Sequence, residues 1–261
     1  MQDFNSINVS IVTFIKDNVK SNNFNGVVLG LSGGIDSAVA AYCATQSLGS
    51  KGVLGLLLPD TDVTLREDID DALKICKILK MDYKIIYVNK VKESFLNLLE
   101  HTDKKLVKGN LVARIRMCIL YYYANLLNRL VLGTTNKTEI LIGYFTKYGD
   151  GASDLSPLAD LYKTQIKELA RFLNIPTDIV DKKSSARLWE NQQTEAEIGL
   201  PFEELDSLLS FIDNQDLGEE SVQSSLQKEF PLIPKPKTDY ILSLIKKNKH
   251  KLRAPSICHL D

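Results

Sequence analysis

The stretch that decides the fold reads Val27-Val28-Leu29-Gly30-Leu31-Ser32-Gly33-Gly34-Ile35-Asp36-Ser37, and the alanine-rich residues 38–41 follow it. The apolar run predicts a buried strand, the glycine pair predicts a turn, and the alanines predict a helix that begins near Ile35. Glycine lets backbone N–H groups approach an anion closely, and the positive end of the helix points at the same place. The stretch therefore predicts a cradle for phosphate groups.

Asp36 lies inside this cradle, where its negative charge would repel a phosphate. A Mg²⁺ ion between the two groups removes that repulsion, so the acid itself indicates a metal. No Lys follows the glycine pair, which excludes the GxxxxGK[ST] loop, and the absence of GxGxxG spacing excludes a dinucleotide fingerprint. A capped turn between a strand and a helix, without a ligand, is the alternative interpretation.

Length and composition fit one large α/β domain, with 261 residues, 44% hydrophobic and 25% charged. A net charge of −1 does not indicate a general polyanion-binding surface, so we expect no nucleic-acid partner. We find neither a leader sequence nor an apolar run near the roughly 20 residues of a membrane span, and we expect a cytoplasmic protein without membrane contact. The cysteines, which form no CxxC pair, are interpreted as buried, reduced thiols: Cys43, Cys76, Cys118 and Cys258.

Apolar runs alternate with helical periodicities along the chain. Strands are predicted at 27–31, 53–58, 85–88 and 129–133, and helices at 1–20, 91–99, 111–127 and 161–173, with a further helix around 72–79 and a polar loop at 101–109. This alternation predicts a Rossmann-like open parallel sheet flanked by helices in a single domain. Within it we expect an N-terminal helix (1–24), a nucleotide-binding α/β core (25–180), and a mobile loop with C-terminal helices (181–261).

Four motifs, taken together, resemble the ammonia-dependent NAD synthetases of the N-type ATP pyrophosphatase superfamily. They are SGGIDS at 32–37, Lys108-Gly109-Asn110 with Arg114 and Arg116, GTTNKTE at 133–139, and FTKYGDG at 145–151. The resemblance runs from residue 26 to the His250-Lys251 pair. It implies the adenine nucleotide alpha hydrolase-like fold and an enzyme in which ATP, with Mg²⁺, adenylates the nicotinate carboxylate of deamido-NAD⁺ and releases pyrophosphate. Ammonia then displaces AMP to give NAD⁺.

The resemblance also implies roles for individual residues. It assigns ATP to Gly30, Leu31, Ser32, Gly33, Gly34, Ile35, Asp36, Ser37, Thr134, Lys163 and Ser185. It assigns Mg²⁺ to Asp36 and Glu139, which with Lys163 form the catalytic set, and deamido-NAD⁺ to Arg114, Lys147, Asp154, His250 and Lys251. Taken alone, Glu139 could be a first-turn helix acid and Arg114 and Arg116 solvated charges, so the assignment depends on the joint order of the motifs. Which of Arg114 and Arg116 faces the substrate stays open.

One segment departs from the family pattern. The family reads approximately P-S-A-G-L-W-P-G-Q-T-D-E, whereas residues 184–195 read SSARLWENQQTE. Arg187 and Asn191 replace glycines, Ser184 and Glu190 replace prolines, and Thr194 replaces an acid. The departures leave the closing geometry of this segment open.

Because only 25 residues precede Gly26, we expect free ammonia rather than glutamine as the nitrogen donor, with a separate glutaminase subunit left open. The family is a homodimer, so we expect the same here, with the helices at 111–127 and at the N-terminus as contacts. Two other functions stay open. One is a different adenylating enzyme, such as a GMP synthetase subunit or a tRNA-modifying ligase, and the other is a non-catalytic adenine-nucleotide sensor.

Overall fold

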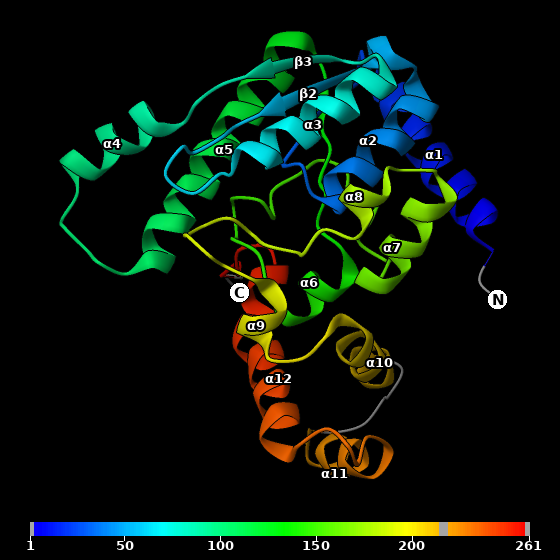
Figure 1. Cartoon of the computed structure of the whole chain (residues 1–261), viewed down its shortest axis with the longest axis vertical. Helices are drawn as coiled ribbons and strands as arrows, with labels where there is room; N and C mark the ends of the chain where they lie inside the picture. The colour runs from blue at the N-terminus through cyan, green and yellow to red at the C-terminus, as the bar shows by residue number, and fades with distance from the viewer. Residues whose placement is uncertain (1–2, 214–218, 259–261) are drawn as a thin grey trace.

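The computed structural model describes residues 3–213 and 219–258, and a four-stranded parallel sheet organises them (Figure 1). The strands stand in the order β3-β2-β1-β4, with bounds β1 Val27–Gly30, β2 Val53–Leu57, β3 Asp82–Ile85 and β4 Leu130–Val131. Parallel neighbours need crossover connections, which the intervening helices provide. The predicted class, an open parallel sheet flanked by helices, is confirmed.

Helices cover both faces of the sheet because successive side chains of each strand point to opposite sides. Val27 and Leu29 of β1 pack into an apolar cluster with α1, α2, α3, α7 and α8, whereas Val28 packs against α5. The bounds on the first face are α1 Phe4–Ser21, α2 Ile35–Leu48, η1 Ser50–Gly52, α3 Arg66–Leu79, α7 Lys163–Phe172 and α8 Thr177–Val180. α5 Lys105–Leu127 covers the second face, and α4 Asn89–Leu98 packs against α5 beyond the sheet.

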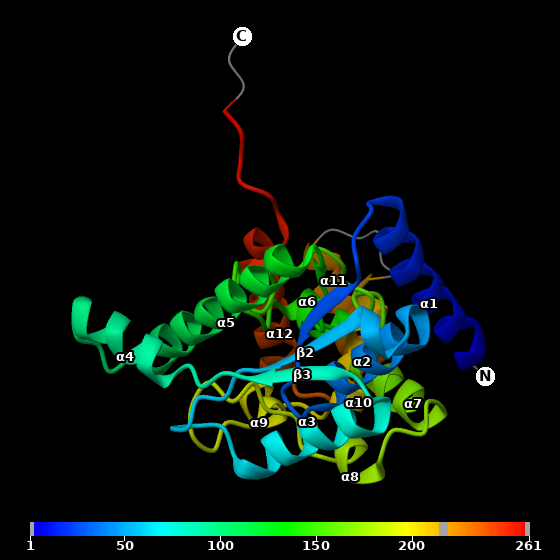
Figure 2. The same ribbon diagram turned by 90° about the horizontal axis from the view of Figure 1, so that it is seen from above.

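A second apolar cluster joins the remaining helices into a group on one side of the sheet layer (Figures 1 and 2). Their bounds are α6 Lys137–Ile142, α9 Thr194–Ile198, α10 Phe202–Asp213, α11 Glu219–Glu229, α12 Lys235–Asn248 and η2 Lys249–Leu252. Leu205, Leu226 and Ile241, from three different helices, are fully buried in this cluster. The cluster therefore gives the C-terminal helices their own core beside the sheet and the helices that cover it.

The third strand lies earlier than predicted, at 82–85 instead of 85–88. All four of its residues are exposed, because β3 is the edge strand and pairs with β2 alone. The apolar run that suggested a strand follows it and still hydrogen-bonds beside β2, where Ile86 N–H donates to the Leu57 carbonyl. An edge strand lacks the continuous apolar signal of a buried one, which explains the error.

The long helix on the second face begins at Lys105 rather than at Leu111, so part of the expected polar loop is helical. Lysine and leucine are good helix formers, and the polar residues of its first turns face solvent. α5 has 23 residues, yet no helix in the described part of the chain is long and apolar enough to cross a membrane.

Only two cysteines match the prediction of buried thiols. Cys43 and Cys76 are buried, and burial raises the pKa of the Cys43 thiol to about 12 and that of Cys76 to about 11. Cys118 and Cys258 are exposed instead. Cys118 lies on the solvent side of α5, and Cys258 follows the last helix, where no neighbouring layer covers it.

Candidate active site

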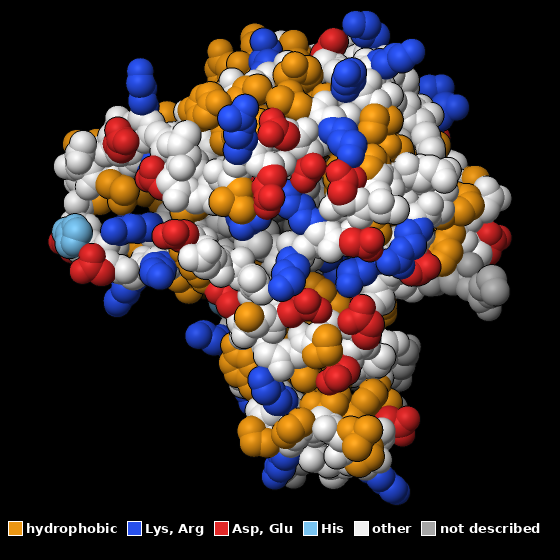
Figure 3. Space-filling model, in the orientation of Figure 1, with side chains coloured by type: hydrophobic (Ala, Val, Ile, Leu, Met, Phe, Trp, Pro, Cys, Tyr) orange, Lys and Arg blue, Asp and Glu red, His pale blue; other side chains and the backbone are white. Residues whose placement is uncertain are grey.

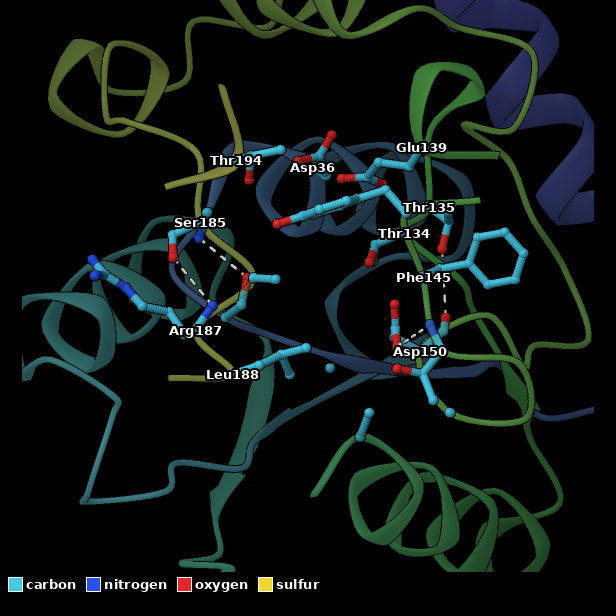
Figure 4. Close-up of a pocket in the computed structure, with 18 of the residues that line it drawn as sticks. Asp36, Thr134, Thr135, Glu139, Phe145, Asp150, Ser185, Arg187, Leu188 and Thr194 are labelled. Atoms are coloured by element: carbon cyan, nitrogen blue, oxygen red, sulfur yellow. Dashed lines mark hydrogen bonds between the residues drawn. The ribbon is translucent and has the colours of Figure 1, made fainter. Parts of the chain in front are cut away.

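One large cavity, of about 920 Å³, opens where the carboxyl ends of β1, β2 and β4 meet (Figure 4). This is the edge at which open parallel sheets bind ligands. The residues predicted from sequence that line it are Gly30, Leu31, Ser32, Gly34, Ile35, Asp36, Ser37, Thr134, Glu139, Lys163, Ser185, His250 and Lys251. The strand ends thus bring together residues that are far apart in the chain.

The cradle after β1 has the predicted strand, turn and helix. α2 begins at Ile35 without a side-chain cap, so its first backbone N–H groups remain available to an anion. Ser37 Oγ donates to the Gly34 carbonyl at 2.9 Å and closes the turn. Gly33 has a φ of +76°, and a Cβ there would lie 2.1 Å from the Asp68 carbonyl oxygen. Only glycine fits at this position.

Asp36, Glu139 and Lys163 form a charged group at the cavity wall. Lys163 Nζ donates to Asp36 Oδ2, although the two residues are 127 positions apart in the chain. Asn136 Nδ2 donates to Asp36 Oδ1 at 2.9 Å, and the Asn136 backbone N–H donates to Glu139 Oε2 at 3.2 Å. One asparagine therefore orients both carboxylates, which Figure 4 shows near each other above the cavity.

The group carries more negative charge than Lys163 can balance. Loss of hydration and the neighbouring charge of Asp36 raise the pKa of Glu139 to about 8. Burial alone would lower the pKa of Lys163, but the charges of Asp36 and Glu139 outweigh it and raise that pKa above its ordinary value. The site is therefore suited to a cation that would share the two carboxylates.

The glycine-rich loop at 143–151 is bound to the C-terminal segment by two lysines. Lys147 Nζ donates to the carbonyls of His250 and Arg253, each at 2.8 Å. Lys251 Nζ donates to the carbonyls of Gly143 and Phe145, at 2.7 and 2.9 Å. Each lysine thus makes two hydrogen bonds to the backbone of the opposite segment, so the loop and the C-terminal segment support each other at the cavity mouth.

Gly33, Arg114, Lys147 and Asp154 do not line the cavity. Arg114 is exposed on α5, and its guanidinium donates to the Lys147 carbonyl at 3.2 Å. Asp154 accepts the Val131 N–H at 2.7 Å and so borders β4. Of the two arginines that the sequence left undistinguished, it is Arg116 that lines the cavity, with its Nε donating to the Leu58 carbonyl at 3.0 Å.

In the segment at 182–194, the two residues that replace glycines of the family pattern both have a left-handed backbone. Arg187 and Asn191, at the two replaced glycines, have φ values of +49° and +58°. This left-handed conformation costs an ordinary residue roughly 1–2 kcal/mol. Arg187 Nε contacts Asp68 Oδ2 at 2.9 Å, and Lys182 Nζ contacts Asp68 Oδ1 at 2.7 Å. Two cations on one buried carboxylate therefore hold the segment, with Ser185, against the cavity.

The chain was compared with known proteins. Residues 7–255 match the family described as NAD synthase. The chain belongs to the NAD synthase family. It is 40% identical to the NH(3)-dependent NAD(+) synthetase of Thermococcus sibiricus over 253 residues, 97% of this chain and 96% of that one. Among solved structures, the NMN synthetase of Francisella tularensis matches with a TM-score of 0.85 and 33% identity, covering 100% of both chains. The NH3-dependent NAD synthetase of Campylobacter jejuni, solved with a nitrate ion, matches with a TM-score of 0.81 and 32% identity, covering 99% of this chain and 100% of that one.

These comparisons confirm the resemblance seen in the sequence motifs, and the structure of this NAD synthase family member adds residues that the motifs did not single out. Asn136 was part of the GTTNKTE motif but had no assigned role. The spacing Asn136-x-x-Glu139 is a capping box, and that signal alone could have shown that each side chain accepts the backbone N–H of the other residue. No local pattern indicated Asp68, because its partners come from a distant segment.

Proposed function

We propose that this protein uses ATP and ammonia to amidate deamido-NAD⁺, giving NAD⁺, AMP and pyrophosphate in the last step of NAD biosynthesis. One observation carries the proposal: the anion cradle at 30–37 opens onto the same cavity wall as Asp36, Glu139 and Lys163. The curated relatives at about 40% identity are named for this NH(3)-dependent reaction. The alternatives left open by the sequence, a GMP synthetase subunit, a tRNA-modifying ligase and a non-catalytic sensor, have no such support.

The cradle suits the phosphates of ATP. Backbone N–H groups at the start of α2 supply uncharged donors, and the helix adds the equivalent of a partial positive charge. We place ATP on residues 30–37 with Thr134, Lys163 and Ser185, all of which border the cavity except Gly33. Gly33 serves by its conformation, because it lets the turn pack against Asp68.

Asp36 and Glu139 suit Mg²⁺, because hard carboxylate oxygens combined with substrate phosphates are the usual ligands of this ion. The raised pKa of Glu139 reflects negative charge that a cation would offset. When bound, the ion would supply charge neutralisation to the phosphates.

The chain's own residues align and stabilise rather than attack. The nicotinate carboxylate is the nucleophile at the α-phosphorus, forming an acyl adenylate and releasing pyrophosphate, and ammonia then displaces AMP. Lys163 Nζ, with a raised pKa, stays charged throughout the neutral range and can neutralise charge that develops on the α-phosphate. Buried at 3% side-chain exposure, it acts with little screening from water.

We further propose a homodimer with the dinucleotide bound near its interface. Large exposed apolar side chains concentrate on α4, α5 and β3: Phe95, Leu98, Leu106, Val107, Tyr122, Leu126, Tyr83 and Ile85. Figure 3 shows apolar atoms gathered around β3 at the top of the view. Exposed apolar patches of this kind mark protein interfaces. Arg114 lies on the same helix, which would bring it, with Lys147 and Asp154, close to a substrate shared by two subunits.

The solved NMN synthetase supports a second candidate, amidation of the mononucleotide nicotinate substrate instead of the dinucleotide. Its TM-score and identity are slightly higher than those of the solved NAD synthetase. Both reactions use the same adenylation chemistry, so the described ATP site does not distinguish them. The difference would lie in contacts to the second nucleotide, for which His250 and Lys251 at the cavity mouth are our candidates.

The test supplies the purified protein with ATP, Mg²⁺ and ammonium, and with either deamido-NAD⁺ or nicotinic acid mononucleotide. We expect NAD⁺, AMP and pyrophosphate in equal amounts from the dinucleotide. Preference for the mononucleotide would select the second candidate, whereas ADP as the product would refute both. Glutamine in place of ammonium should give almost no turnover, as expected for a free-ammonia enzyme.

We expect this reaction in the cytoplasm.

A further inference from the structure

Lys163 is the first residue of α7, so the position of its ammonium depends on where that helix begins. The first N–H groups of a helix lack partners within it. Here the Lys163 N–H donates to Thr138 Oγ1 at 2.9 Å, and the Thr164 N–H donates to Asp206 Oδ2 at 2.8 Å. The start of α7 is therefore held by side chains of α6 and α10.

The two acceptors are themselves joined. Thr138 Oγ1 donates to the other carboxylate oxygen of Asp206 at 2.5 Å. Thr138 is fully buried and Asp206 is 5% exposed, so water does not compete for these bonds. The Asp206 carboxylate accepts from α6 and α7 at once, while the α10 helix that carries it packs against both (Figure 1).

The two threonines bonded to Asp206 are chain neighbours of the charged residues of the site. Thr138 directly precedes Glu139, and Thr164 directly follows Lys163. Each of the two charged side chains thus has, as its immediate chain neighbour, a residue bonded to Asp206. α10 contacts Lys163 a second time, since the Phe202 ring centroid lies 5.6 Å from Lys163 Nζ. No other role in the proposed reaction uses Asp206.

We propose that Asp206 is a positioning residue for the proposed reaction: its carboxylate locks the starts of α6 and α7 together and so sets Lys163 Nζ relative to Glu139. The inference rests on the proposed function for its effect on turnover, but the anchoring of α7 stands on geometry alone. It also gives the C-terminal helices a part in the chemistry, because α10 carries both Asp206 and Phe202.

The test compares Asp206→Asn with Glu203→Gln. Glu203 lies on the same helix and also reaches α7, through an exposed pair with Lys167 at 3.3 Å, so it is the matched control. Asparagine has nearly the volume of aspartate, but its side chain has a single acceptor oxygen. Two donors, the Thr138 hydroxyl and the Thr164 N–H, point at this side chain. We expect kcat to fall roughly 10- to 100-fold, as for an ångström-scale misplacement, while KM for ATP stays within about twofold. The control should keep both constants.

Substitutions at Thr138 provide an independent test of the same proposal. Thr138→Val removes the hydroxyl between Lys163 N–H and Asp206 and should reproduce the loss in kcat, whereas Thr138→Ser keeps the hydroxyl and should restore most of it. Amide hydrogen exchange at Lys163 and Thr164, measured without substrate, should accelerate at least about tenfold in Asp206→Asn and stay unchanged in the control Glu203→Gln. Unchanged exchange in the folded variant would overturn the anchoring, and unchanged kcat would overturn the positioning role. If the unaltered protein forms no NAD⁺, the proposed function is contradicted. Amide exchange would then still test whether Asp206 anchors the start of α7.

Discussion

Replacing Glu139 by glutamine should stabilise the substrate-free protein at neutral and alkaline pH while removing its activity. The carboxyl group shares the cavity wall with Asp36, and loss of hydration together with that charge raises its pKa from 4.5 to about 8. Glutamine keeps an oxygen that can accept the Asn136 N–H, now bonded at 3.2 Å, and carries no charge. The variant thus imitates the protonated form.

The magnitude of this change in stability follows from the difference in the Glu139 pKa between the folded and the unfolded chain. Because the folded chain binds this proton more tightly than the unfolded chain, stability is lost as the pH rises from 4.5 to about 8. Each pH unit in this interval corresponds to ~1.4 kcal/mol, which sets an upper bound of ~3 kcal/mol at pH 7. Water that reaches the partly exposed carboxyl reduces the effect, and we expect about 1–2 kcal/mol, or roughly 2–8 °C in Tm.

The assay is thermal unfolding with a metal chelator present, at about pH 5 and about pH 8. Glu139→Gln should gain stability at the higher pH and almost none at the lower. Glu204→Gln, at an exposed position on α10, is the control and should stay within about 0.5 kcal/mol of the unaltered protein at both. A gain of the same size at both values, or a loss at the higher one, would refute the argument.

Substitutions at four other positions test the remaining contacts. Asp36→Ala should abolish adenylation without unfolding the chain, and retained pyrophosphate release would exclude its role at the phosphates. Gly33→Ala should cost at least about 2 kcal/mol in denaturant unfolding and weaken ATP binding, because its Cβ would overlap a backbone oxygen at 2.1 Å; normal binding by titration would contradict this. Arg187→Gln should cost about 1–3 kcal/mol and raise KM for ATP, with Arg187→Lys less affected; equal KM in both and in the parent would argue against the ionic contact. Leu126→Glu should give monomers in sedimentation velocity, and an unchanged sedimentation coefficient would exclude this face of α5 from the interface.

Local sequence patterns predicted some features of the fold and the site and missed others. The Val27–Gly30 strand, the cradle and the helix at Ile35 follow from adjacent residues, and the structure agrees with each. Prediction failed at β3, because an edge strand with exposed side chains gives no apolar run. It also left Arg114 and Arg116 undistinguished, since on one helix only the packing of neighbours decides which side chain faces the cavity.

From the sequence alone came the family, the order of strands and helices, and the residue types that can hold phosphate and metal. These are local properties, because the periodicity of apolar residues, the glycine turns and the motif spacing all depend on residues that are neighbours in the chain. Only the tertiary structure decided that Lys163 meets Asp36 across 127 positions, that Asp68 binds Arg187, and that Asp206 joins α6 to α7. Such pairings arise where packed helices exclude water, so that a buried charge must bond to the side chains that packing brings within reach, and chain order does not encode that distance.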